Sequence, residues 1–269
     1  MQVISLLTNS AKSWYESDMK SYAAAFSYYA PLAIIPILLF SITMVGTIYS
    51  ESITRQILTG WAGVLGDDIV ELIKIAITNL RIEAESFHLP IFGIVLSLGI
   101  SILALNALSN GFHKLWNVHQ FGLHAWFKKS LRSVLFILIF QIYLAVVIGF
   151  EFFMIVNNLQ SDYILSLLFL FISTGAFFAI LFRFLASHSP SWKGCLVGAL
   201  VASLLFIVTK SSVNIYVIKV ANLNIYGTAG LILVLLLWVY ILAALIYYGA
   251  AIAYEYDKIK AIRINSSVN

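Results

Sequence analysis

Residues 231–254 read LILVLLLWVYILAALIYYGAAIAY, without a single Asp, Glu, Lys or Arg. A helix needs about 20 mostly apolar residues to cross the hydrocarbon core of a bilayer, so this stretch is long enough to span a membrane. Five further stretches upstream also lack these four residue types, at 21–50, 86–113, 133–150, 163–182 and 194–209. The pattern therefore predicts a polytopic membrane protein.

The composition supports this interpretation. Of the 269 residues, 61% are hydrophobic and only 10% are charged, whereas soluble domains carry roughly a quarter charged residues. We expect an all-α bundle of six transmembrane helices that forms a single integral membrane domain over residues 1–269. The spans are predicted near 22–47, 89–110, 132–152, 163–184, 194–216 and 229–254. Cys195 is the single cysteine, which excludes an intrachain disulfide.

The distribution of Lys and Arg predicts the orientation of the chain. Eleven of them fall in the N-terminal segment, the second and fourth connections and the C-terminal tail, against five in the other three connections. Positive charge is retained on the cytoplasmic side of a membrane, so both termini are expected in the cytoplasm. The formal net charge of +4 is thereby explained by topology, and no nucleic-acid partner is expected.

Two segments outside the spans have amphipathic patterns. Residues 1–21 are expected to form a short amphipathic helix. The first connection, 51–87, is expected to be periplasmic and to contain a helix that Asp68 caps, with Glu71 three residues later as a capping box. This loop helix could lie on the outer membrane surface or cover the end of the bundle.

The first span carries two prolines, Pro31 and Pro36. Each proline removes a backbone donor and clashes with the preceding turn. The pattern is open to two interpretations: a broken helix of the kind that builds transporter sites near the bilayer midplane, or a kinked helix with a packing role. In the first case Ser27 and Tyr28 would line the path of a solute.

The second span ends with polar side chains at helical spacing. Asn106, Asn110 and Lys114 recur every four residues and so share one face of a helix. Buried amides must be hydrogen-bonded, so they either join two helices or line a wet cavity. Upstream of residue 200, Gly194 and Gly198 form a GxxxG pattern that favours close helix contact.

Two ionisable residues near span ends are further candidates. Lys210 can extend its ammonium group to the membrane interface, so its position has a structural explanation as well as a functional one. Glu255 is more suggestive, because a carboxylate on a short side chain reaches the interface less easily. Tyr226 and Gly227, at the start of the last span, would also face the proposed path.

No catalytic or metal-binding motif is present. The sequence lacks HExxH, GxSxG and a phosphate-binding glycine loop. His113, His119 and His124 share one connection, but their spacing matches no metal template. We therefore expect no enzymatic activity, no cofactor and no metal site.

Four stretches together resemble one family. NALSNGFHKLWNV (106–118) resembles the signature after the second span of the YihY/BrkB membrane family, historically also labelled ribonuclease BN. AAAFSYYAPLAIIP (23–36), GALVASLLFIVTKSSVNIYV (198–217) and YGTAGLILVLLLWVYILAALIYYGA (226–250) resemble its first, fifth and sixth spans, with Lys210 on the usual lysine. One position departs: the family commonly has Glu where this chain has Ala251, and Glu255 lies one helical turn later.

The resemblance implies a bacterial inner-membrane protein with six helices. Members of the family are associated with serum resistance, virulence and the cell envelope, and are often treated as transporters. The ribonuclease label fits this sequence poorly, because RNA cleavage needs clustered acids and bases or metal ligands.

Two functions follow as hypotheses. The first is a transporter or exporter of a small or lipid-linked solute, and the second is a non-transporting envelope scaffold or interaction protein. An enzyme has least support. Membrane lipids are the expected partners, and association into a homo-oligomer is left open.

Overall fold

A computed structural model describes residues 2–48, 88–118, 123–157, 163–186, 190–220 and 227–268. Every regular element in these ranges is an α-helix, which confirms the predicted fold class. The helices are α1 (Gln2–Glu16), α2 (Met19–Ile48), α5 (His88–Leu115), α6 (Leu123–Val156), α7 (Tyr163–Leu185), α8 (Trp192–Val220) and α9 (Gly227–Val268). The helix predicted in the first connection, 51–87, lies outside the described residues.

The helices are long and apolar enough for a membrane bundle. Four stretches in the described part of the chain could cross a bilayer by length and hydropathy: Trp126–Val147, Ile164–Leu185, Trp192–Lys210 and Leu235–Ile262. Each of the six predicted spans lies inside one helix of the set α2 and α5 to α9. A crossing by all six helices remains a prediction.

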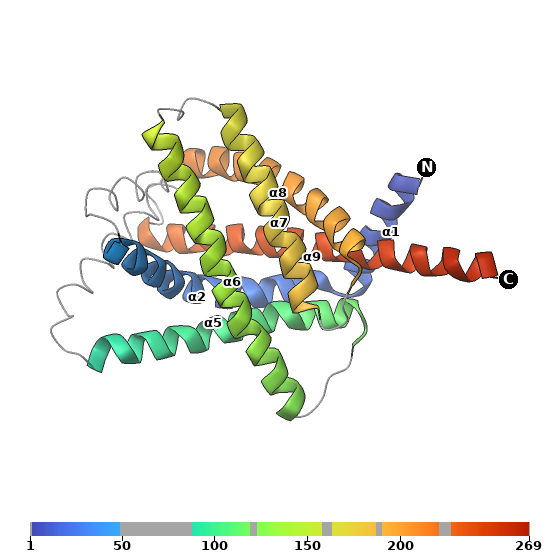
Figure 1. The fold of residues 1–269 in the computed structure, drawn as a ribbon, viewed down its shortest axis with the longest axis horizontal. Helices are drawn as coiled ribbons and strands as arrows, with labels where there is room; N and C mark the ends of the chain where they lie inside the picture. Colours follow the sequence, from blue (N-terminus) through green and yellow to red (C-terminus); the bar gives the residue numbers. More distant parts are fainter. Residues whose placement is uncertain are drawn as a thin grey trace.

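Helix α9 lies at the centre of the arrangement. It packs against α1, α2 and α8, while α2 also packs along α5, and α8 along α7. Figure 1 shows α2, α5 and α9 running side by side, with α6 and α7 crossing them steeply. Helix α6 contacts α5 over a short stretch and otherwise leans on α7. The bundle is thus held together around α9, with α6 at its periphery.

An aromatic cluster fills the core between α5, α7 and α9. Phe112 makes edge-to-face contacts with Tyr247, at a centroid distance of 5.6 Å, and with Phe182, at 6.1 Å. All three side chains are fully buried. Edge-to-face packing places the positive ring edge against the negative face of the neighbour, so the contact adds to the gain from burial.

Small residues let α8 and α9 approach each other closely. A Cβ atom placed on Gly198 would overlap with the carbonyl oxygen of Gly249, and one on Gly194 would press against Ala253. Only glycine permits this backbone separation, as in other small-residue contacts between membrane helices. The helix contact predicted from the GxxxG pattern is therefore present.

The two prolines do not interrupt α2. Of the two interpretations of the first span, the broken helix is not seen, because α2 runs without a gap from Met19 to Ile48. Pro31 is buried, and Pro36 lies inside the same helix. Each proline removes only one backbone donor, and α5 and α9 pack along α2 and support it. The packing interpretation of these prolines fits the helix.

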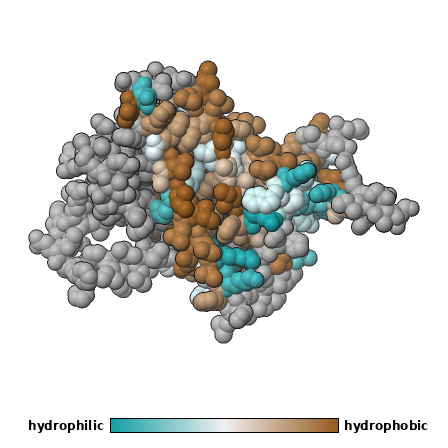
Figure 2. Space-filling model, in the orientation of Figure 1, coloured by the Kyte–Doolittle hydropathy of each residue, from teal (hydrophilic) through white to brown (hydrophobic). Residues whose placement is uncertain are grey.

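The outward surface of α6 and α7 is apolar. Leu138, Ile142 and Val146 of α6 are exposed, as are Ile164 and Ile172 of α7. Figure 2 shows hydrophobic side chains over these two helices. Soluble monomers rarely expose apolar surface so continuously, whereas hydrocarbon chains of lipid would cover it. The arrangement is that of a helical membrane protein.

Candidate functional site

Two polar contacts join α5 to α6. The hydroxyl group of Ser133 donates a 3.1 Å hydrogen bond to the Asn106 Oδ1 atom, and both residues are buried. One turn away on each helix, the Lys129 ammonium group donates to the Asn110 Oδ1 atom. The helices run in opposite directions here, so the spacing of four residues on α5 matches the same spacing on α6. We call these four residues the α5–α6 polar ladder.

The ladder bears on the two interpretations of the asparagine stripe, helix cross-linking and a wet cavity. Both asparagines bond to a neighbouring helix, as the cross-linking interpretation requires. The contribution of α6 was not predicted, because Ser133 lies at the expected start of the third span and Lys129 lies in the connection before it, and neither belongs to a distinctive motif. Their spacing of four residues was the available indication.

Other backbone and side-chain contacts fix α5 against α7 and α9. The Ser109 hydroxyl group donates a 3.2 Å bond to the Leu185 carbonyl oxygen at the end of α7. The Tyr247 hydroxyl group of α9 donates a 3.1 Å bond to the Leu108 carbonyl oxygen. The ring of Tyr247 lies over Gly111, where a Cβ atom would overlap with it. The last two turns of α5 are therefore held from three sides.

Helix α5 ends in a defined cap. Asn117 has a positive φ of 51°, the left-handed conformation that asparagine tolerates better than most residues. The amide of Val118 donates to the His113 carbonyl oxygen at 2.8 Å, and the Asn117 amide donates to that of Lys114 at 3.1 Å. These two bonds form a Schellman motif, which satisfies the last carbonyl groups of the helix. In the sequence GFHKLWNV (111–118), the glycine at the start is thus explained by the contact with Tyr247, and the Asn-Val pair at the end by the helix cap.

His113 lies beside the ladder, beyond the predicted second span. Its Nε2 atom is 3.4 Å from the Ser109 hydroxyl oxygen. Burial first, and then the nearby charges of Lys129 and Arg132, together lower the pKa of His113 to about 4. The imidazole is therefore neutral at physiological pH, and it lies in a region of positive potential.

The residues predicted in the first span do not join the ladder. Ser27 is buried, but its hydroxyl group donates to the Ala24 carbonyl oxygen of its own helix at 2.8 Å. Tyr28 is 64% exposed and packs edge-to-face on Tyr29. Among the described contacts, no hydrogen bond connects either residue with Asn106 or Asn110.

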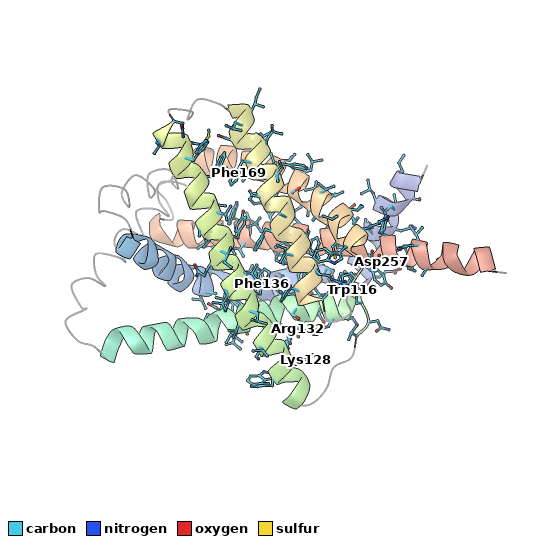
Figure 3. All side chains as sticks on the ribbon, viewed as in Figure 1. Trp116, Lys128, Arg132, Phe136, Phe169 and Asp257 are labelled. Carbon is cyan, nitrogen blue, oxygen red and sulfur yellow. The ribbon has the colours of Figure 1, made fainter. Side chains whose placement is uncertain are left out.

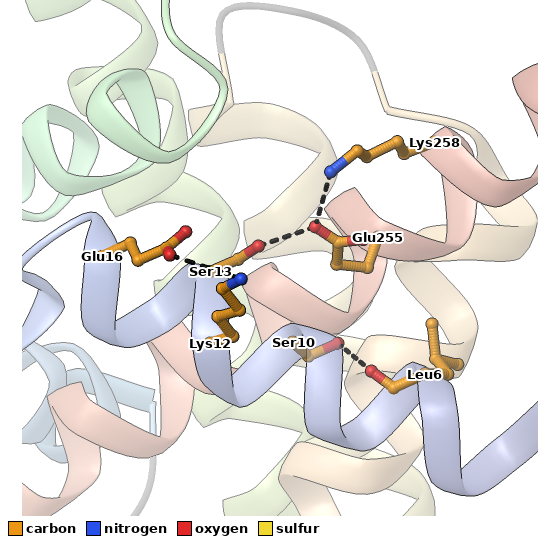
Figure 4. A network of polar contacts seen from close by, with 7 residues as sticks. All are labelled: Leu6, Ser10, Lys12, Ser13, Glu16, Glu255 and Lys258. Carbon is orange, nitrogen blue, oxygen red and sulfur yellow. Dashed lines mark hydrogen bonds and ion pairs between the residues drawn. The ribbon is translucent and has the colours of Figure 1, made fainter.

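Glu255 forms a second polar group, on α9. It is 3% exposed, and its carboxylate accepts a 2.6 Å bond from the Ser13 hydroxyl group of α1. The Lys258 ammonium group approaches the same oxygen atom at 3.3 Å (Figure 4). The Tyr248 hydroxyl group adds a 3.2 Å bond to the Leu7 carbonyl oxygen. Glu255 therefore joins α1 to the centre of the bundle.

A third polar group surrounds Asp257, which the sequence did not single out. Its carboxylate accepts a 2.7 Å bond from the Ser191 amide and another bond from the Ser191 hydroxyl group. The Ser191 oxygen in turn accepts a 3.0 Å bond from the Gly194 amide, so Ser191 caps the start of α8. A carboxylate at this position also interacts favourably with the positive end of the helix. No sequence pattern connects positions 191 and 257.

These groups gather at one end of the bundle, which we call the terminal end. The Trp116 ring at the end of α5 contacts Tyr254 of α9 at 6.0 Å, and Asp257 reaches the start of α8. Figure 3 shows Trp116 and Asp257 at this same end. Arg183 also lies here, over the Trp192 ring and bonded to the Pro190 carbonyl oxygen. The segments rich in Lys and Arg thus share one end with α1.

The remaining predicted residues lie away from the ladder or outside the description. Lys210 is half-buried at the end of the apolar part of α8. Gly227 is the first residue of α9, and Tyr226 lies outside the described residues. In the described ranges, no three His, Cys, Asp or Glu side chains come together as metal ligands would. The chemistry of the ladder is therefore hydrogen bonding between amide, hydroxyl and ammonium groups.

Two comparisons with known proteins support the family resemblance of the sequence. A family model described as "Virulence factor BrkB" matches residues 10–266. A UPF0761 membrane protein of Haemophilus influenzae (strain 86-028NP) is 23% identical over 266 residues, which cover 92% of this chain and 93% of the relative. No solved structure matches the chain.

Proposed function

Because the chain belongs to the family of virulence factor BrkB membrane proteins, we propose that it moves a small or lipid-linked solute across the bacterial inner membrane. The observation that carries this proposal is the α5–α6 polar ladder. Two amide groups, a neutral hydroxyl group and a charged ammonium group occupy this contact between helices. Apolar side chains could fill the same contact without any cost of desolvation. Polar residues retained inside a membrane bundle are functional candidates for this reason.

The ladder has the properties of a contact that can exchange partners. Its inner rung, Asn106 with Ser133, is buried, and its outer rung contains the exposed Asn110. Helix α6 makes only short contacts with α5 and α2. If α6 moves away, a solute with hydroxyl or phosphate groups can replace the lost hydrogen bonds, so that opening leaves no unsatisfied amide.

The orientation is part of the proposal. We infer that the terminal end faces the cytoplasm, because cations of the N-terminal segment, the second and fourth connections and the tail belong to this end. The outer rung of the ladder then lies closer to the cytoplasm than the inner rung. Solute would enter the ladder region from the cytoplasmic side in an exporter.

Cysteine accessibility in the native bilayer tests transport. Cys195 is first replaced by Ala, and Asn106→Cys, Asn110→Cys and Ser133→Cys are then made one at a time. We expect water-borne thiol reagents to label position 110 readily and positions 106 and 133 more slowly. Leu138→Cys, on the exposed apolar surface of α6, is the control that stays unlabelled in lipid. If positions 106, 110 and 133 resist labelling from both sides, the transport proposal should be dropped.

One observation favours the alternative, an envelope scaffold. Helix α9 continues past Glu255 to Val268, about 20 Å at 1.5 Å per residue, and Figure 1 shows this end projecting beyond the other helices. A projecting helix offers a surface for a protein partner. Removal of residues 259–269 would abolish a scaffold function and leave labelling at position 110 unchanged.

A further inference from the structure

Three hydroxyl groups come together between α6 and α7. Tyr143 belongs to α6, and Ser173 and Thr174 are neighbours on α7. The hydroxyl groups of Ser173 and Thr174 both interact with the hydroxyl group of Tyr143. The two helices pack against each other, and Figure 1 shows them running side by side. We call these three residues the hydroxyl cluster.

Aromatic packing fixes the position of the Tyr143 ring. The ring stacks on Phe177 of α7, with a centroid distance of 4.6 Å. Phe140 of α6 lies 6.2 Å from the Tyr143 ring and 5.6 Å from the Phe177 ring, so it contacts both. A ring that is packed by two neighbours has few alternative positions. The Tyr143 hydroxyl group is therefore held beside the two hydroxyl groups of α7.

The hydroxyl cluster lies far from both ends of the helices that carry it. Thr174 is the eleventh residue of the 22-residue apolar stretch Ile164–Leu185 of α7. Tyr143 lies near the middle of the span predicted at 132–152. Hydrocarbon offers no hydrogen-bond partner, so a hydroxyl group at this depth has to be satisfied by the protein or by an ordered water molecule.

The contacts within the protein do not satisfy Thr174. This residue is 4% exposed, and its Oγ1 atom has no hydrogen-bond partner among the residues that the structure describes. The interaction between Thr174 and Tyr143 thus lacks the geometry of a direct hydrogen bond. The Ser173 hydroxyl group donates its proton to the Leu170 carbonyl oxygen at 3.3 Å, so the Ser173 oxygen is left as an acceptor. Polar groups that face each other beyond direct reach are commonly joined by water.

From this arrangement we propose that the hydroxyl cluster binds one water molecule, which joins α6 to α7 near the centre of the membrane. The water accepts hydrogen bonds from the Tyr143 and Thr174 hydroxyl groups and donates one to the Ser173 oxygen. A buried water typically makes about three hydrogen bonds, and these three side chains provide them. The site does not depend on the transport function proposed above.

Infrared spectroscopy of the full-length protein in lipid tests the site, with water itself as the probe. Samples are hydrated with deuterated water that contains either the common oxygen isotope or a heavier one. The O–D stretching band of a bound water shifts with the heavier oxygen, whereas the O–D bands of side chains do not. Thr174→Val keeps the shape of the side chain and removes its hydroxyl group. We expect an isotope-sensitive band in the wild type that Thr174→Val and Tyr143→Phe both lose.

Two further variants are controls for the band. Thr174→Ser keeps a hydroxyl group and should keep the band, which separates loss of the water from a defect in folding. Ser203→Ala is the matched control, because Ser203 is also fully buried but donates its hydroxyl proton to the Leu200 carbonyl oxygen of its own helix at 3.0 Å. This variant should keep the band as well. Absence of the band from the wild type, or its persistence in Thr174→Val, would overturn the site.

Thermal unfolding in detergent distinguishes the water from two other arrangements. With a water bound, Thr174→Val should lower the unfolding temperature, and Thr174→Val with Tyr143→Phe should lose less than the two single variants lose together. A higher unfolding temperature in Thr174→Val would show that the hydroxyl group is unsatisfied, which would overturn the proposal. Losses that are less than additive, without an isotope-sensitive band, would show a direct bond between the two hydroxyl groups and would also overturn it.

Discussion

The Ser13 hydroxyl group of α1 donates a 2.6 Å hydrogen bond to the Glu255 carboxylate of α9, across 242 positions of sequence. Through this bond the amphipathic N-terminal helix is attached to the helix at the centre of the bundle. The carboxylate is almost fully buried, so its two partners, Ser13 and Lys258, compensate much of the cost of removing its charge from water.

Glu255→Gln should weaken the attachment of α1. The amide keeps the size of the side chain but loses the charge that strengthens the bond from Ser13, and hydrogen bonds to charged groups contribute about 1.5–3 kcal/mol. We expect a lower thermal unfolding temperature in detergent and faster proteolysis within residues 1–18. Glu16→Gln, on the exposed side of α1, should change neither. Equal protease resistance in Glu255→Gln and the wild type would show that this bond does not hold α1.

The position of Glu255 bears on its departure from the family pattern. Ala251, where the family commonly has Glu, and Glu255 are both buried on α9. They lie one turn apart and face the same side of the helix. The carboxylate in this chain is thus closer to the terminal end and engages α1.

Gly111→Ala should destabilise the bundle because of Tyr247. The added methyl group would overlap with the tyrosine ring, which is fully buried between helices and has little room to move. Overpacking of this kind costs about 1–3 kcal/mol. Tyr247→Ala alone should also destabilise, through the cavity that it leaves. Thermal unfolding of both single variants and of the double variant checks the contact. The double variant should lose less stability than the two single variants lose together, and additive losses of stability would contradict the contact.

Much of the fold follows from charge-free segments. The presence of six long apolar helices could be predicted because apolar length is a strong constraint in lipid. Their bounds could not: α6 (Leu123–Val156) and α9 (Gly227–Val268) extend well beyond the predicted spans. The arrangement of the helices could not be predicted, because an apolar helix face can contact either lipid or a neighbouring helix. Gly111 illustrates the difference: the sequence shows a glycine in a helix, but only the position of Tyr247, 136 residues later, explains it.

The candidate site was predicted in part for a similar reason. Asn106 and Asn110 were identifiable because two amides at helical spacing are expensive to leave unbonded in a membrane. Their partners on α6 were not, because Ser133 and Lys129 resemble ordinary residues at the start of a span. Tyr28 was expected to line a solute path only if the first span were broken, and it is exposed on the surface of α2.

His113→Gln should make the protein less sensitive to acid. The folded-state pKa of about 4 lies below the ordinary value of 6.5, through burial first and then through Lys129 and Arg132. Above pH 6.5 the imidazole is neutral in both states and contributes nothing. As the pH falls from 6.5 to 4, the unfolded state binds a proton that the folded state rejects, so stability decreases. The thermal unfolding temperature should therefore fall less steeply over this range in His113→Gln than in the wild type. Parallel curves would contradict the shifted pKa.

Asp257→Asn should destabilise the start of α8. The variant loses the negative charge at the positive end of the helix and weakens the bonds from the Ser191 amide and hydroxyl group. Ser191→Ala removes the cap itself, which costs about 0.5–2 kcal/mol at a helix start. Since the two residues contact each other, their effects on thermal unfolding should be less than additive in the double variant. Simple addition would show that Asp257 acts elsewhere.

Gly198→Ala should separate α8 from α9, and a matched glycine in the same protein provides the control. The Cβ atom at position 198 would overlap with the backbone carbonyl group of Gly249, which cannot move aside as a flexible side chain could. Gly149, in α6, has open space around the position of its Cβ atom. Gly149→Ala should therefore be neutral or slightly stabilising, because alanine favours a helix by roughly 1 kcal/mol over glycine. Thermal unfolding of the two variants reports the contact. Gly198→Ala should lower the unfolding temperature, whereas Gly149→Ala should leave it unchanged or raise it slightly. If Gly198→Ala unfolds at the wild-type temperature, the close approach of α8 and α9 is wrong.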